Sequence, residues 1–209
     1  MSITGQEVNL LKDVMNSLVS QLGTIQIVQP ELLPYDWRKA AKGRTVWRLL
    51  EEIIVQNLMY NPTNYGLISA NPPTSEVGVW DLELIHPEIP YPVYINIKSA
   101  TSGIKNSKDD ISKANGLYKF FTNNPEAALF VVTFSLEFLP AMQVRISQVF
   151  VMPVTWLPDI YVNPSNNGNL QSSCYKDITK AINRSNNIFL AELNQAMDLA
   201  RQKKLRKKV

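Results

Sequence analysis

Two neighbouring stretches decide the fold of this chain: GVWDLELI at residues 78–85 and VYINIKSA at residues 93–100. Apolar and polar residues alternate in both, and this period of two predicts a strand over residues 77–85 and another over residues 93–98. Three prolines between them, at positions 87, 90 and 92, indicate a short turn. We therefore predict an antiparallel hairpin.

Elements on either side of the hairpin predict a layered domain. Apolar residues recur at helical spacing in the first twenty residues and over residues 45–58. Apolar, β-branched residues predict a buried strand over 128–138 and a further strand over 142–152. The remaining predictions are a short strand at 65–70, loops at 99–112 and 158–169, and helices at 111–121, 175–183 and 187–207. Helices around a strand cluster indicate an α/β or α+β domain that spans residues 1–209.

Composition excludes several classes of function. The 209 residues carry a net charge of +3, which permits nucleic-acid binding without arguing for it. One cysteine, Cys174, excludes an internal disulfide, and no secretion signal or membrane-spanning stretch is visible, so a cytoplasmic protein is expected. His86 is the single histidine, which excludes zinc sites built on several imidazoles. No glycine-rich phosphate-binding loop is present.

Asp81 and Lys98 have the chemistry that a phosphodiesterase needs. They lie on the two predicted strands of the hairpin, so both side chains can point into one cleft. A carboxylate binds Mg²⁺ through oxygen, and the metal activates water and stabilises charge on a phosphate. A lysine beside them can orient or deprotonate that water. An ordinary polar strand face is the alternative interpretation of the same residues.

The hairpin resembles the motif of PD-(D/E)XK nucleases, in which an acid on the first strand is followed by (D/E)-x-Lys on the second. By position, Asp81 matches the first acid, Asn96 the second acid and Lys98 the lysine, while Ser99 and Thr101 match the small hydroxyl residues that often follow. The resemblance covers residues 42–102. It implies an α/β fold with a restriction-endonuclease-like core, in which a central mixed sheet is flanked by helices.

Asn96 departs from the family pattern because it is neutral where the family has a carboxylate. The resemblance places a further metal-binding glutamate on the preceding helix, where Glu51 and Glu52 both lie. Glu51 is favoured because it lies closer to the apolar stripe of that helix. Glu83 is a second candidate, since it shares the strand face of Asp81. A weakly bound single metal and a protein that has lost its chemistry remain as alternatives.

The resemblance implies a type II restriction endonuclease that cuts double-stranded DNA with Mg²⁺, as a homodimer. A repair or recombination nuclease of the same fold and an inactive DNA-binding protein are the alternatives. DNA-reading residues are expected between residues 99 and 119, and in the loop that spans residues 161–175. The candidate DNA contacts are Ser99, Thr101, Lys105, Asn106, Lys108, Lys113 and Asn115.

Overall fold

The structure is a computed structural model that describes residues 3–33, 35–37, 42–74, 78–103, 108–165 and 168–206, with the backbone only for residues 42–45. The strands of the described residues form two sheets, one with the order β1-β7-β6-β4-β3-β2 and a smaller one with the order β5-β9-β8. The helices are α1 Gly5–Leu22, α2 Lys42–Tyr60, α3 Ala114–Asn123 and α4 Asn186–Arg206. The main sheet contains β1 Thr24–Gln26, β2 Ser69–Asn71, β3 Leu82–Ile85, β4 Val93–Thr101, β6 Ala128–Leu139 and β7 Gln143–Pro153. The smaller sheet contains β5 Asp109–Lys113, β8 Tyr161–Val162 and β9 Asn169–Ser172.

The predicted hairpin is confirmed as β3 and β4, which pair antiparallel with Leu84 opposite Val93 and Leu82 opposite Ile95. The first strand is shorter than expected, because β3 begins at Leu82 and Asp81 directly precedes it. The Asp81 backbone N–H still donates to the Ile95 carbonyl at 2.7 Å, so the pairing extends one residue further. Asp81 is therefore held against β4 at the end of the regular strand.

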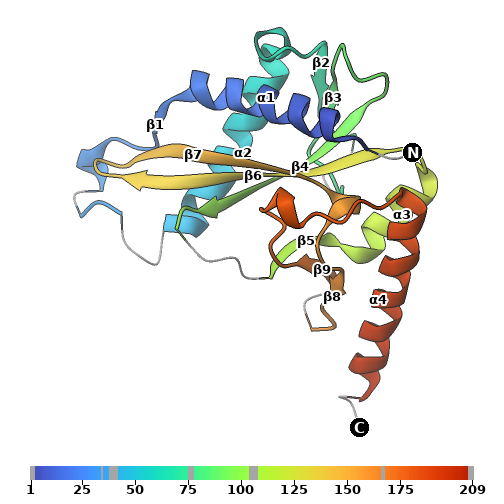
Figure 1. Cartoon of the computed structure of the whole chain (residues 1–209). Helices are drawn as coiled ribbons and strands as arrows, with labels where there is room; N and C mark the ends of the chain where they lie inside the picture. The colour runs from blue at the N-terminus through green and yellow to red at the C-terminus, as the bar shows by residue number, and fades with distance from the viewer. Residues whose placement is uncertain are drawn as a thin grey trace.

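The centre of the main sheet is β6, whose first nine residues are buried. It pairs parallel with β4 and antiparallel with β7, which makes the sheet mixed. Helices cover both faces of this sheet, with α1 against β7 and α2 against β4 (Figure 1). On the face opposite α2, Tyr94 of β4 contacts Phe120 of α3, and Phe121 contacts Phe189 of α4. The expected α/β fold with a central mixed sheet is confirmed.

Several predicted segments differ in the structure: the strand expected at residues 65–70 is only β2, and the loop expected at 99–112 includes the end of β4 and the start of β5. Residues 111–113 belong to strand β5, and the predicted helix begins only at Ala114. The predicted helix over residues 175–183 is wrong, because it is reduced to a 3₁₀ turn at Ile178–Lys180. The turn starts where the Asp177 side chain accepts a hydrogen bond from the Thr179 N–H, and Cys174 before it has a φ of 56°, outside the helical region. The expected loop at 158–169 contains β8 and the start of β9.

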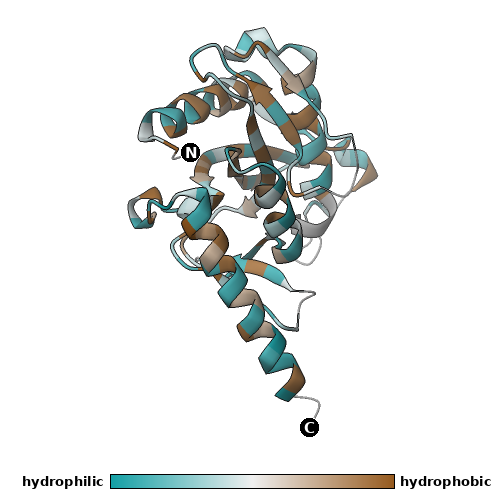
Figure 2. Ribbon diagram, turned by 90° about the vertical axis from the view of Figure 1, so that its right-hand side faces the viewer, coloured by the Kyte–Doolittle hydropathy of each residue, from teal (hydrophilic) through white to brown (hydrophobic). Residues whose placement is uncertain are grey.

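The smaller sheet and α4 lie together at one end of the molecule (Figure 1). The interior residues of this sheet, Val162 and Leu170, are buried. The first half of α4 buries Phe189 and Leu193, whereas its final turn carries Lys203, Lys204 and Arg206 and extends past the rest of the protein (Figure 2). None of the described helices has the length and apolar character needed to cross a membrane.

Candidate active site

A cleft of about 500 Å³ opens between α2 and the end of the β3–β4 hairpin. The α2 wall contributes Trp47, Arg48, Glu51, Glu52 and Val55, and the hairpin contributes Asp81 and Ile97. The helix takes this position because Val46, Leu50, Ile54 and Leu58 bury one side of it against the core. Leu49, also an apolar residue of this helix, is 44% exposed and so lies outside the buried side. The neighbouring flank of α2 therefore faces the cleft.

Asp81 is fixed at the mouth of the cleft by two backbone hydrogen bonds. Its N–H donates to Ile95, and its Oδ2 accepts from the Ile97 N–H at 2.6 Å. The carboxylate therefore takes the place that a strand carbonyl would have in the ladder. Part of the residue stays exposed to solvent, and the protein packed around its carboxyl group raises the pKa. The Ile97 N–H and the Lys98 ammonium act in the opposite direction.

Glu51 has the most strongly perturbed carboxyl group of this site. Its pKa is raised from 4.5 to about 7, first by burial and then by the negative charge of Asp81, while Lys98 and Arg48 act to lower it. Glu52, the next residue, is exposed and accepts a hydrogen bond from Gln56 at 2.7 Å. Two carboxyl groups, Glu51 and Asp81, therefore meet in the cleft without enough positive charge to hold both fully ionised at ordinary pH.

Lys98 lies within the electrostatic reach of both acids. It occupies β4, where the parallel register places it beside Thr133 of β6. Burial lowers the pKa of its ammonium group, and the carboxylates of Asp81, Glu51, Asp110 and Asp109 counteract that effect, in that order. The three predicted residues Glu51, Asp81 and Lys98 are thus brought together as one coupled group, although they come from three elements.

Asn96 and Glu83 lie elsewhere. The Asn96 side chain donates from Nδ2 to the Val79 carbonyl at 2.9 Å, so its amide group is engaged with the backbone before β3. Burial raises the pKa of the Tyr94 hydroxyl, and the Glu83 carboxyl group opposite it on the adjacent strand adds to this through its charge and a hydrogen bond. Neither residue is among those that line the cleft. Their role as metal ligands stays a prediction.

The predicted DNA contacts are distributed over several elements. Ser99 and Thr101 line a small hollow of about 130 Å³ beside Trp47. Lys108 precedes β5, and Lys113 ends it with an exposed side chain. Asn115 of α3 borders a hollow of about 350 Å³ that also includes Arg201 and Lys204 of α4. Two candidates, Lys105 and Asn106, lie outside the described residues.

Two acids near the site were missed as site residues. They are Asp109 and Asp110, which fall in the stretch expected to be a loop but lie on β5, where their negative charges raise the pKa of Lys98. Asp109 also forms an ion pair with Lys176 at 3.0 Å. No local pattern in the sequence marks this pair, because its proximity to Lys98 depends on how the smaller sheet is packed.

The comparisons with known proteins concern the fold alone. No protein-family model and no curated protein sequence matches this chain. Among solved structures, the chain is similar to the NlaIV restriction endonuclease, with a TM-score of 0.53 and 11% sequence identity, over 98% of this chain and 87% of the other. A mixed six-stranded sheet flanked by helices, aligned over almost the whole chain, shows that the protein has a restriction-endonuclease-like fold.

Proposed function

We propose that this chain is a Mg²⁺-dependent endonuclease that hydrolyses phosphodiester bonds of double-stranded DNA, and that it acts as a type II restriction endonuclease. The observation that carries the proposal is that Glu51 and Asp81 line one cleft while Lys98 interacts electrostatically with both, and burial shifts the pKa of all three groups. Shifted groups of opposite charge in a cleft are typical of catalytic sites.

The donor set of the cleft fits magnesium. Mg²⁺ is usually held by one or two carboxylates, with waters and substrate phosphate oxygens completing its shell. Glu51 and Asp81 would supply the two carboxylates, and their unbalanced negative charge would favour a divalent cation in the cleft. Among the described residues no group of three or more acids, histidines or cysteines could hold a metal, so the remaining ligands would be water and the phosphate.

Each side chain has a distinct part in the proposed reaction. When bound, magnesium lowers the pKa of a water molecule and stabilises the charge that develops on the phosphate. The Asp81 carboxylate is held in a fixed direction by the Ile97 N–H, which preorganises it as a ligand. Glu51 supplies the second carboxylate once it is ionised. The lowered pKa of Lys98 increases the fraction of its amine that is neutral, and only the neutral amine can accept a proton from the attacking water.

The DNA substrate and the homodimer are proposed on separate grounds. The structural neighbour is described as a restriction endonuclease, but a likeness at 11% identity shows only the fold. Basic side chains gather on the last turn of α4 and beside β5, on the same side of the protein as the smaller sheet. A second copy is proposed because cleavage of both strands at a palindromic site requires two-fold symmetry.

The test uses purified wild-type protein and four variants on long unmethylated duplex DNA, with and without Mg²⁺. We expect discrete fragments with wild-type protein only when Mg²⁺ is present. Asp81→Asn and Lys98→Gln should each reduce the cleavage rate at least about a hundredfold, since they remove a metal ligand and a proton acceptor.

Asp13→Asn and Lys12→Gln are the matched controls, because they make the same chemical changes on the exposed side of α1. Both should cleave like the wild type. Intact DNA with wild-type protein under Mg²⁺ and under Mn²⁺ would refute the nuclease proposal, and would favour a protein that keeps the fold and only binds DNA.

A further inference from the structure

The smaller sheet presents one polar face. Along β9, Leu170 and Ser172 are fully buried, whereas Asn169 and Gln171 point the other way and are partly accessible. In the neighbouring strands, Ile111 of β5 and Val162 of β8 are buried on the same inner side. The alternation of a half-buried sheet therefore turns a row of amide and carboxyl groups outward.

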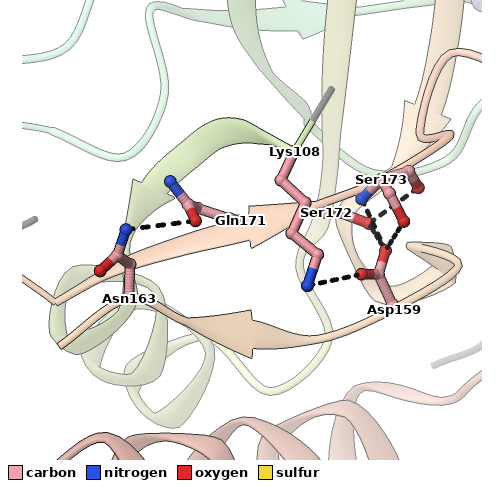
Figure 3. A network of polar contacts seen from close by, with 6 residues as sticks. All are labelled: Lys108, Asp159, Asn163, Gln171, Ser172 and Ser173. Carbon is pink, nitrogen blue, oxygen red and sulfur yellow. Dashed lines mark hydrogen bonds and ion pairs between the residues drawn. The ribbon is translucent and has the colours of Figure 1, made fainter. Parts of the chain in front are cut away.

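These outward groups form a connected row across all three strands. Asp110 of β5 accepts hydrogen bonds from Gln171 Nε2 at 2.6 Å and from Asn169 Nδ2 at 3.0 Å. The other end of the Gln171 amide, Oε1, accepts from Asn163 Nδ2 at 3.4 Å, just after β8. Figure 3 shows Asn163 and Gln171 joined in this way. Hydrogen bonds between these side chains therefore hold them in fixed positions.

A second network fixes the strand that carries this row. Asp159 Oδ1 accepts hydrogen bonds from Ser172 Oγ at 2.8 Å, from the Ser173 N–H at 2.6 Å and from Ser173 Oγ at 3.0 Å (Figure 3). The other carboxylate oxygen lies 4.0 Å from the Lys108 ammonium group. Asp159 therefore ties the end of β9 to the chain before β8. A polar row on a supported strand is better suited to recognition than the same residues on a loop.

Positive charge borders the row on the side of α4. Tyr161 lies directly opposite Gln171 in the strand register. The Lys108 Nζ is 4.3 Å from the centre of the Tyr161 ring, and the Lys203 Nζ of α4 is 5.7 Å from it. The Asp159 carboxylate offsets part of the charge of Lys108, and the two ammonium groups beside one ring still present positive charge to an anion. A phosphate group has this chemistry.

We propose that the outward face of Asn163, Asn169, Gln171 and Asp110 reads base edges of duplex DNA, while Lys108 and Lys203 contact the adjoining phosphates. Amide side chains pair with adenine in the major groove and a carboxylate accepts from the cytosine amino group, so the row has the groups that direct reading uses. Strands are known to enter a groove for this purpose. The inference deepens the proposed nuclease function and rests on DNA being its substrate.

The position of Asp110 connects this face with the candidate active site. Asp110 belongs to the polar row through its hydrogen bonds with Asn169 and Gln171. Its negative charge is also one of those that raise the pKa of Lys98. Bases read at the row would therefore lie beside the phosphate that Lys98 serves. An ordinary solvated sheet face, by contrast, would have no effect on which DNA sequences are bound.

The test selects bound duplexes from a pool of random sequences, without added metal, and sequences them. The wild type should enrich a defined site. Gln171→Ala should lose the preference at one or two base pairs of that site, with affinity for it about 5- to 150-fold lower and affinity for the unselected pool unchanged. Gln148→Ala is the matched control, because it removes an exposed glutamine from β7 instead. It should keep the wild-type preference.

A second arm separates base reading from phosphate contact. Lys203→Gln should leave the enriched sequence unchanged and reduce the slope of log affinity against log salt by about 0.9, the value for one lost phosphate contact. Asn163→Ala provides a second variant of the polar row that leaves the bonds of Asp110 in place. Circular dichroism of each variant shows whether the fold is kept.

The proposal is overturned if folded Gln171→Ala and Asn163→Ala both retain the wild-type preference, or if the wild type enriches no sequence. The two proposals fail in different ways. DNA that is cleaved without sequence preference would leave the nuclease standing and remove the reading face. Sequence-selective binding of DNA that is never cleaved would do the opposite.

Discussion

Replacing Glu51 with glutamine tests the electrostatics of the cleft without any need for a substrate. Glutamine has nearly the same shape as the glutamate side chain but carries no charge at any pH. The native protein raises the pKa of Glu51 from 4.5 to about 7, chiefly through burial and secondly through Asp81. Ionising Glu51 therefore costs folding free energy, and the variant is relieved of that cost.

The size and sign of the effect follow from linkage. Between pH 4.5 and about 7 the native state holds the Glu51 proton more tightly than the unfolded state, so the free energy of unfolding falls as pH rises through this window. The full cost is reached above pH 7, at about 3 kcal/mol, and only about 1 kcal/mol has developed at pH 5. Glu51→Gln should therefore be about 3 kcal/mol more stable than the wild type at pH 8 and about 1 kcal/mol more stable at pH 5.

Urea denaturation at the two pH values, without divalent metal, measures the difference. Glu52→Gln is the matched control, since it makes the same change one residue along on the exposed side of α2. Its free energy of unfolding should stay within about 0.5 kcal/mol of the wild type at both pH values. Addition of Mg²⁺ should then stabilise the wild type at pH 8 and leave Glu51→Gln nearly unchanged, because the charge that attracts the cation is gone.

A Glu51→Gln protein that is as stable as the wild type at pH 8, or less stable, would refute this reasoning. The same holds if its advantage is equal at pH 5 and pH 8, because a benefit without pH dependence comes from packing and not from ionisation. Either result would mean that Glu51 ionises normally and that the cleft lacks the unbalanced charge on which the metal proposal depends.

Three further predictions concern the elements that position the site. Gly116→Ala should destabilise the protein by about 1–3 kcal/mol in thermal denaturation, because the added methyl group would lie 2.9 Å from Val79 Cγ1. Gly5→Ala is the control and should not destabilise the protein, because the space around Gly5 is open. Asn186→Ala should lower the free energy of unfolding in urea by about 1–3 kcal/mol, because the buried Asn186 side chain donates to the Pro125 and Ala127 carbonyls. Asn187→Ala changes an exposed asparagine and should lower it little. Equal values for the two variants would contradict the argument from buried hydrogen bonds. Mg²⁺ at about 100 times its dissociation constant should stabilise the wild type by about 2.7 kcal/mol and should fail to stabilise Asp81→Ala, which calorimetry with and without the metal would check.

The sequence determined the elements whose signal is local. The period-two alternation around Asp81 and Lys98 indicates the hairpin, and the run from Ala128 indicates the buried central strand, because burial on one or both faces leaves a direct imprint on neighbouring residues. The amphipathic pattern of α2 also placed Glu51 on the flank that turned out to face the cleft. The element that carries each of Glu51, Asp81 and Lys98 was therefore predictable, whereas their proximity depends on how α2 packs against β4.

The sequence failed where neighbours distant along the chain decide. Residues 175–183 have a helical spacing of apolar groups, yet the structure leaves only a 3₁₀ turn, since the chain just before it is tied to Asp159 through Ser173. Lys98 and the β5 acids are brought together by packing of the smaller sheet, which no short pattern encodes. The family motif placed Asn96 and strand alternation placed Glu83 near Asp81, and the hydrogen bonds of these two side chains to Val79 and Tyr94 are contacts that no short pattern predicts. A sequence thus determines what each strand can present, and the tertiary structure decides which of those groups meet, because meeting depends on contacts between elements rather than on spacing within one.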